Sequence, residues 1–222
     1  MLTIVFDLDG TLIDTAPDLV ETLNFILTQE GLPAIPFETA RNLIGGGAER
    51  MIERALTAAG RSPASEMNRL YPAFIAHYAA HIAEHSRPFP HLETTLNGLA
   101  AAGHRLAVCT NKLEWLSIRL LQTLKLSQHF AAICGQDTFG VQKPNPEVFR
   151  RTVRRAGGDP AQAIMIGDSR TDIDTARAAG VPVVAVDFGY SDVPMAGLLP
   201  DRLISSFADL PAAIGDLIAA PT

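Results

Sequence analysis

The chain has 222 residues, of which 47% are hydrophobic and 19% are charged, and its formal net charge is −6 at pH 7. This composition is typical of a globular protein with one good core and a smaller module, and the acidic balance argues against a nucleic-acid-binding protein. No apolar run reaches the length of a membrane span, and the apolar N-terminus lacks the basic leader of a signal peptide. We therefore expect a cytoplasmic protein with neither nucleic acid nor membrane as a partner.

The first predicted element is a short apolar strand, residues 2–6, that leads into the sequence Asp-Leu-Asp-Gly-Thr at residues 7–11. Its uninterrupted apolar character predicts burial on both faces, and Gly10 permits a sharp turn after it. Asp7 and Asp9 then lie at the carboxyl end of a buried strand, which is the edge where open α/β sheets bind ligands. Two such carboxylates can hold Mg²⁺, and one can attack phosphorus while the other transfers a proton. Two solvated acids in a turn are the alternative.

The next segment, residues 16–87, carries helical signals throughout and ends at a Pro-Phe-Pro sequence. Helices are predicted at 37–44 and 48–59, on either side of a glycine triplet, and the last helix, 65–84, contains a proline that predicts a kink or a split. We therefore divide the chain into a core, residues 1–15 and 88–222, and an all-helical cap, residues 16–87.

Beyond the cap, strands and helices alternate. Apolar runs predict strands at 105–109, 133–134, 163–166 and 182–186, with helices between and after them. Such alternation predicts a parallel sheet with right-handed crossovers. The expected fold class is therefore α/β, a doubly wound parallel sheet with a Rossmann-like core and an inserted all-helical cap domain.

Three later segments carry polar residues that would complete a site beside the first strand. Thr110 and Asn111 follow one strand, where a hydroxyl and backbone N–H groups suit a phosphate oxygen. Lys143 precedes a stiff proline-rich turn, which would fix a cation near a transferring phosphoryl group. Asp168 follows another strand and would be a third acid for a metal. Asp172 can be a ligand, a supporting acceptor behind the ligands or only a helix N-terminal charge.

These four motifs, in this order, resemble those of the haloacid dehalogenase-like hydrolase superfamily, and the resemblance runs essentially from end to end. It implies a phosphoaspartate mechanism with Asp7 as nucleophile and Asp9 as acid and base, while Thr110 and Lys143 hold the phosphoryl group. It also implies Mg²⁺ held by Asp7, the backbone carbonyl of Asp9, and Asp168. Dehalogenases and phosphonatases of the superfamily lack the second aspartate, so Asp9 favours a phosphate ester or a mutase substrate.

The cap loop at residues 44–50 resembles that of bacterial phosphoglycolate phosphatases, as do residues 53–56, 110–112 and 188–190. A glycine-rich loop lets the backbone approach a small ligand closely, and a cationic side chain could pair with the glycolate carboxylate. The candidate substrate-binding residues are Gly45, Gly46, Gly47, Arg50, Asn111 and Lys112. The alternatives are a plain linker for the triplet and an exposed helix charge for Arg50.

The expected function is hydrolysis of a phosphomonoester, with 2-phosphoglycolate preferred by resemblance. The alternatives are another small organophosphate, a sugar-phosphate mutase, or a non-enzymatic phospho-acceptor domain. An acceptor domain needs no helical insert after its first strand, so the insert favours an enclosed substrate. We expect a small phosphorylated metabolite as the partner and a monomer or homodimer as the assembly.

Overall fold

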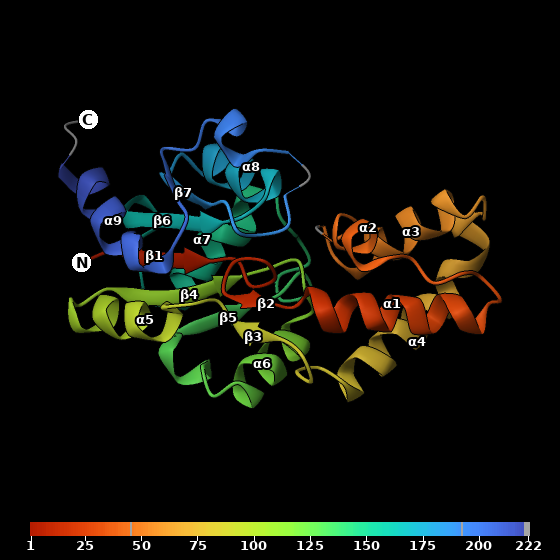
Figure 1. Cartoon of the computed structure of the whole chain (residues 1–222). Coiled ribbons are helices and arrows are strands. Elements are labelled where there is room, and N and C mark those ends of the chain that lie inside the picture. Colours follow the sequence, from red (N-terminus) through yellow and green to blue (C-terminus); the bar gives the residue numbers. More distant parts are fainter. Residues whose placement is uncertain (45, 192, 220–222) are drawn as a thin grey trace.

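The computed structural model describes residues 1–44, 46–191 and 193–219 (Figure 1). Its main element is a parallel six-stranded sheet with the strand order β5-β4-β1-β6-β7-β8. The strands are β1 (Thr3–Phe6), β4 (Arg105–Cys109), β5 (Ala132–Cys134), β6 (Ala163–Gly167), β7 (Val183–Val186) and β8 (Arg202–Ile204). The first strand of the chain therefore lies in the middle of the sheet, between β4 and β6.

Helices cover both faces of this sheet (Figure 1). They are α5 (Leu92–Ala101), α6 (Glu114–Thr123), α7 (Pro146–Arg155), α8 (Arg170–Ala179) and α9 (Leu210–Ala219), with single 3₁₀ turns at Ser127–His129, Pro160–Gln162, Met195–Leu198 and Phe207–Asp209. Two apolar clusters result, and β1 contributes to both: Ile4 and Phe6 pack on one face and Val5 on the other. The predicted doubly wound α/β core is confirmed, including the burial of β1 on both faces.

Four further helices form the insert, and they lie together at one end of the sheet (Figure 1). They are α1 (Ala16–Gln29), α2 (Phe37–Arg41), α3 (Ala48–Ala58) and α4 (Pro63–Ala80). The predicted helical cap is thus present, and the boundaries that we assigned to it stay predictions. Of the two outcomes predicted at Pro72, a kink or a split, the split is wrong, because α4 runs through this residue as one helix.

The chain enters and leaves the insert through a two-stranded antiparallel ribbon, β2 (Ile13–Asp14) with β3 (Arg87–Pro88). Beside the ribbon, the buried Asp18 carboxylate accepts hydrogen bonds from the backbone N–H groups of His85 and Ser86, at 2.9 and 2.8 Å. These contacts tie the start of α1 to the returning chain. The ribbon and β8 were not predicted, because each of these short strands contains a charged residue and lacks the continuous apolar run that marks β5.

None of the described helices combines the length and the apolar character needed to cross a membrane.

Candidate active site

The carboxyl ends of the three central strands bring the candidate residues together. Phe6 is in register with Val108 of β4 and Ile166 of β6, so Asp7, Thr110 and Asp168 follow adjacent strands at one edge of the sheet. A cavity of about 230 Å³ lies there, between this edge and the cap. Its lining includes the described candidate residues other than Asp172: Asp7, Asp9, Gly46, Gly47, Arg50, Thr110, Asn111, Lys112, Lys143 and Asp168. Gly45 lies outside the described residues.

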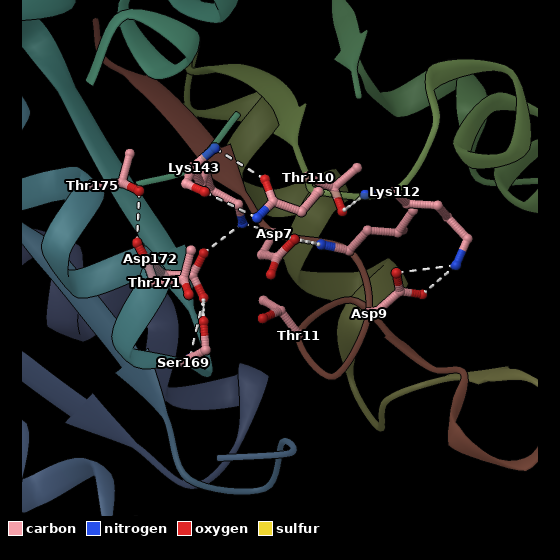
Figure 2. Close-up of polar contacts among 12 residues, drawn as sticks. Asp7, Asp9, Thr11, Thr110, Lys112, Lys143, Ser169, Thr171, Asp172 and Thr175 are labelled. Atoms are coloured by element: carbon pink, nitrogen blue, oxygen red, sulfur yellow. Dashed lines mark hydrogen bonds and ion pairs between the residues drawn. The ribbon is translucent and has the colours of Figure 1, made fainter. Parts of the chain in front are cut away.

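Lys143 is a buried cation of the site, with 3% of its surface exposed. Its Nζ lies 2.6 Å from Asp172 Oδ1 and 3.0 Å from Asp7 Oδ1 (Figure 2). Burial opposes the charged form, but these two carboxylates raise the pKa of Lys143 above its usual value. The ammonium therefore stays charged beside the candidate nucleophile.

Asn111 fixes the backbone that carries this lysine. Its Oδ1 accepts from the N–H of Lys143 at 3.0 Å, and its Nδ2 donates to the carbonyl of the same residue at 3.1 Å. Asn111 was predicted to bind substrate. In the structure, both the oxygen and the nitrogen of its side-chain amide are hydrogen-bonded to the backbone of Lys143. Thr110 differs: its hydroxyl oxygen accepts from the Lys112 N–H at 3.2 Å, so its proton can be donated to a phosphoryl oxygen.

Asp172, whose role the sequence left open, is fully buried. One carboxylate oxygen binds Lys143, and the other accepts from the N–H and the hydroxyl of Ser169, at 3.1 and 2.6 Å. These contacts identify Asp172 as the partner that holds Lys143 in place.

Asp168 is also held through both of its oxygens. Oδ1 accepts from the Thr11 hydroxyl at 2.7 Å, and Oδ2 accepts from the Tyr190 N–H at 2.8 Å. Glycines make this packing possible, because a Cβ on Gly10 would lie 2.4 Å from Asp168 Oδ2 and one on Gly189 would lie 2.2 Å from Asp168 Cβ. Gly10 also has a φ of +81°, so both conformation and space require glycine at this turn.

The acids at this edge form a site that fits a hard cation. Asp7, Asp168 and Asp172 each offer an oxygen within 4.8 Å of the others, and Lys143 is paired with two of them, Asp7 and Asp172. Burial raises the pKa of the Asp7 carboxyl to about 8, against the opposing charge of Lys143. Burial and the Asp172 carboxylate raise the pKa of Asp168 to about 6. A divalent cation with oxygen ligands would offset this excess of negative charge, so the donor set suits Mg²⁺.

The carboxylate of Asp9 faces a different partner. Its Oδ1 and Oδ2 lie 2.7 and 3.0 Å from Lys112 Nζ (Figure 2). Oδ1 also accepts from the Thr15 hydroxyl at 2.7 Å. Lys112 is buried, and its Nζ lies 4.5 Å from the ring centroid of Tyr78 on α4. Lys112 was a candidate for substrate binding, and in the structure it is the ion-pair partner of the candidate acid and base.

On the cap side, the glycine loop lies directly over the core. A Cβ on Gly47 would come within 3.1 Å of the Asn111 carbonyl oxygen, and the φ angles of Gly46 and Gly47 are +82° and +92°. Arg50 lies in the first turn of α3, on the cap side of the cavity. It is exposed, and its side chain folds back against Gly46. The loop is therefore part of the cavity wall.

Several residues of the site were not predicted from the sequence. Thr11 and Tyr190 both hold Asp168, and Tyr78 lies under Lys112. A signal existed for two of them, since Thr11 belongs to the first motif and Tyr190 ends the motif at 188–190. Tyr78 lies among apolar helix residues, and its spacing gave no indication of a polar neighbour.

Comparison with known proteins identifies the family. Residues 4–186 match the model of the haloacid dehalogenase-like hydrolases. The phosphoglycolate phosphatase of Mesorhizobium japonicum is 50% identical, over 92% of this chain and 90% of that protein, and the enzyme of the same name from Caulobacter vibrioides is 48% identical, over 95% and 90%. A crystal structure of a predicted phosphoglycolate phosphatase from Haemophilus somnus superposes with a TM-score of 0.88 at 30% identity, covering 96% of this chain and 98% of that one. The sequence, the fold and the arrangement of acids at the strand ends agree, and the chain belongs to the haloacid dehalogenase-like hydrolase family.

Proposed function

We propose that this hydrolase is a Mg²⁺-dependent phosphomonoesterase that acts on 2-phosphoglycolate through an aspartyl-phosphate on Asp7. The substrate is suggested by relatives 46–50% identical that are named phosphoglycolate phosphatase. The volume of the cavity, about 230 Å³, suits a small metabolite enclosed by a cap. A cytoplasmic location and a monomeric or homodimeric state stay predictions.

In the first half-reaction, a carboxylate oxygen of Asp7 attacks phosphorus and the bond from phosphorus to the glycolate oxygen breaks. Asp9, in its protonated form, gives its proton to that leaving oxygen. Lys143 and the Thr110 hydroxyl hold the phosphoryl oxygens and offset their charge. The products of this half-reaction are glycolate and the aspartyl-phosphate.

In the second half-reaction, Asp9 takes a proton from water as the water oxygen attacks phosphorus. The bond from phosphorus to the Asp7 oxygen breaks, which releases inorganic phosphate and restores both carboxyl groups. Lys112 pairs with the ionised form of Asp9, so it stabilises the state that acts as base in this step.

Asp7 and Asp168 would hold the metal, with the backbone carbonyl of Asp9 as a further oxygen ligand and Asp172 behind them. When bound, Mg²⁺ supplies positive charge that lets the Asp7 carboxylate and an anionic substrate approach each other. Thr11 and Tyr190 orient Asp168 for this role, through the two hydrogen bonds already described.

Arg50 is our candidate for the substrate carboxylate. It lines the cavity from the cap side, and its guanidinium can bind a carboxylate through two N–H groups. Lys112 is the weaker candidate, because its ammonium already contacts both oxygens of Asp9.

The single observation that carries the proposal is the setting of Asp7: a carboxylate on the cavity wall, 3.0 Å from a buried lysine and grouped with two further acids. Phosphate release from a panel of phosphorylated metabolites, at one Mg²⁺ concentration, tests the function. We expect the highest kcat/KM for 2-phosphoglycolate and loss of activity on chelation. Activity that survives thorough chelation would contradict the metal-dependent scheme, and a higher kcat/KM for a sugar phosphate would contradict the substrate.

A further inference from the structure

The segment at residues 188–190 contacts both the cap and the proposed metal site. Its contacts with the cap have no role in the proposed mechanism. The peptide group between Gly189 and Tyr190 is hydrogen-bonded at each end. Its N–H donates to Asp168 Oδ2 at 2.8 Å, and its carbonyl oxygen accepts from Arg41 Nη2 at 2.9 Å. Arg41 is the last residue of the cap helix α2, whereas Asp168 follows the core strand β6. One peptide group therefore lies between a cap side chain and a core carboxylate.

A peptide group is planar and resists rotation about its C–N bond. Its N–H and carbonyl oxygen consequently move together, so a shift of the carbonyl also moves the hydrogen bond to Asp168. Polarisation acts in the same direction, because a cation on the carbonyl oxygen strengthens the N–H as a donor. The close packing of Gly189 against Asp168 leaves little room for the peptide to change its position without the carboxylate.

The rest of Tyr190 joins this segment to the chain crossing into the cap. Its hydroxyl donates to Asp14 Oδ1 at 2.6 Å and accepts from the N–H of Ala16 at 2.8 Å. Those two residues belong to β2 and to the start of α1. Arg41 also lies over the Tyr190 ring, 5.2 Å from its centroid, and its Nη2 reaches the Phe188 carbonyl oxygen at 3.4 Å. The cap thus holds the segment through Arg41 on the guanidinium side, and the ribbon and the first residue of the cap hold it on the phenol side.

We infer that Arg41 and Tyr190 are positioning residues that transmit the placement of the cap to Asp168 through the Gly189–Tyr190 peptide. A cap seated on the core holds the peptide, and the peptide holds the carboxylate. If the contact of Arg41 or that of the Tyr190 hydroxyl is lost, Oδ2 of Asp168 is less constrained, although the hydrogen bond from Thr11 to Oδ1 persists. This inference rests on the proposed role of Asp168 as a metal ligand.

The test is Mg²⁺ binding to the full chain without substrate, measured by isothermal titration calorimetry, so that catalysis does not enter the readout. Arg41→Met keeps the length of the side chain but removes its donors and its charge. We expect it to raise the Mg²⁺ dissociation constant by about fivefold or more, the scale of the net contribution of one hydrogen bond. Arg41→Lys should restore part of the affinity, because it keeps the charge and one donor.

The matched control is Arg69→Met, which removes the same charge from another cap arginine. Arg69 pairs with Glu30 inside the cap, and both residues belong to the cap segment. This variant should bind Mg²⁺ as the wild type does. Tyr190→Phe is the independent second variant: it keeps the N–H that Asp168 accepts and removes only the hydroxyl held by Asp14 and Ala16. It should also weaken Mg²⁺ binding. If Arg41→Met fails to fold, this variant alone tests the coupling between the cap and Asp168.

Wild-type affinity in folded Arg41→Met and Tyr190→Phe would overturn the coupling, and so would equal losses in Arg41→Met and Arg69→Met. Absence of Mg²⁺ binding by the wild type would instead overturn the metal site itself, and the coupling with it. The two failures are therefore distinguishable in one experiment.

Discussion

The core wall and the cap wall of the cavity hold their polar side chains in different ways. On the core side, Lys143 and Asp168 line the cavity and are each 3% exposed, while Asp172, their neighbour, is 0% exposed; each of the three is fixed by two or more polar contacts. On the cap wall, Arg50 is exposed and folds back on a glycine. Charges that act on phosphorus need fixed positions, whereas a side chain that recognises the variable part of a substrate can adapt to it.

Because of this difference, substitutions in the two walls should have different effects on activity. Changes in the core wall should lower the rate for every phosphate ester, because each ester presents the same phosphoryl group. Changes in the cap wall should alter the preference among esters. The following predictions test that division.

The largest loss should follow Asp7→Asn, which replaces the proposed nucleophile by a neutral amide of the same shape. We expect kcat to fall by at least about 10⁴-fold, since loss of a covalent nucleophile removes the reaction path itself. The loss should be equal for 2-phosphoglycolate and for p-nitrophenyl phosphate, measured as phosphate release. Asp209→Asn, at an exposed position in the last 3₁₀ turn, is the control and should leave kcat unchanged. Near-wild-type hydrolysis of either ester by Asp7→Asn would contradict the mechanism.

Asp9→Asn should come next, and its effect should depend on the leaving group. General acid catalysis contributes about 10²–10⁴-fold when an alkoxide must be protonated. Nitrophenolate barely needs the proton, so formation of the aspartyl-phosphate should slow less for p-nitrophenyl phosphate. Rapid-quench measurement of that first step on both esters checks this. Equal losses on the two would count against Asp9 as the acid.

Asp172→Asn should act on stability as well as on rate. It removes one of the two carboxylates that hold a buried ammonium, and breaking a buried ion pair costs on the order of 3 kcal/mol in the free energy of unfolding. Urea denaturation of the metal-free protein measures this cost. Glu147→Gln removes a partner of the half-exposed Arg150 and should cost less than about 1 kcal/mol. Similar costs for the two variants would show that Lys143 does not depend on Asp172.

The smallest expected effect belongs to the cap wall. Arg50→Ala should lower kcat/KM for 2-phosphoglycolate by about 1.5–3 kcal/mol in transition-state binding, or roughly 10–150-fold, and should leave an ester without a carboxylate nearly unaffected. Lys112→Ala should lower the rate on both esters, because it removes the partner of Asp9. Parallel losses on both esters for Arg50→Ala would remove the carboxylate-recognition proposal and leave the phosphatase assignment intact.

The elements that could be predicted from the sequence are those with local signals. Continuous apolar runs identified β1, β4, β6 and β7, and the polar residues directly after them followed from the rule that parallel strands present their carboxyl ends at one edge. Helical periodicity and the glycine triplet likewise identified the insert. These signals lie within a few residues of the feature that they predict.

The remaining features depend on residues far apart in the chain. Lys112 and Asp9 are 103 residues apart, and Tyr190 and Asp168 are joined through a backbone N–H that any residue could supply. Lys112 was therefore assigned to substrate, because its partner was not visible in its own segment. At Pro72 a local signal was present but misleading. Proline usually breaks a helix, and here tertiary packing keeps α4 as one helix.

The central place of β1 also bears on how the chain folds as it is synthesised. Thr3 pairs with Arg105 on one side and with Ala163 on the other, so all of the cap and then more than half of the core follow β1 out of the ribosome before both neighbours exist. Until both β4 and β6 are made, at least one edge of β1 has no native partner in the sheet, and contacts of such long sequence separation form slowly. The strand that leads to the nucleophile is consequently among the first segments made, and it gains its second neighbour in the sheet only after most of the chain has been synthesised.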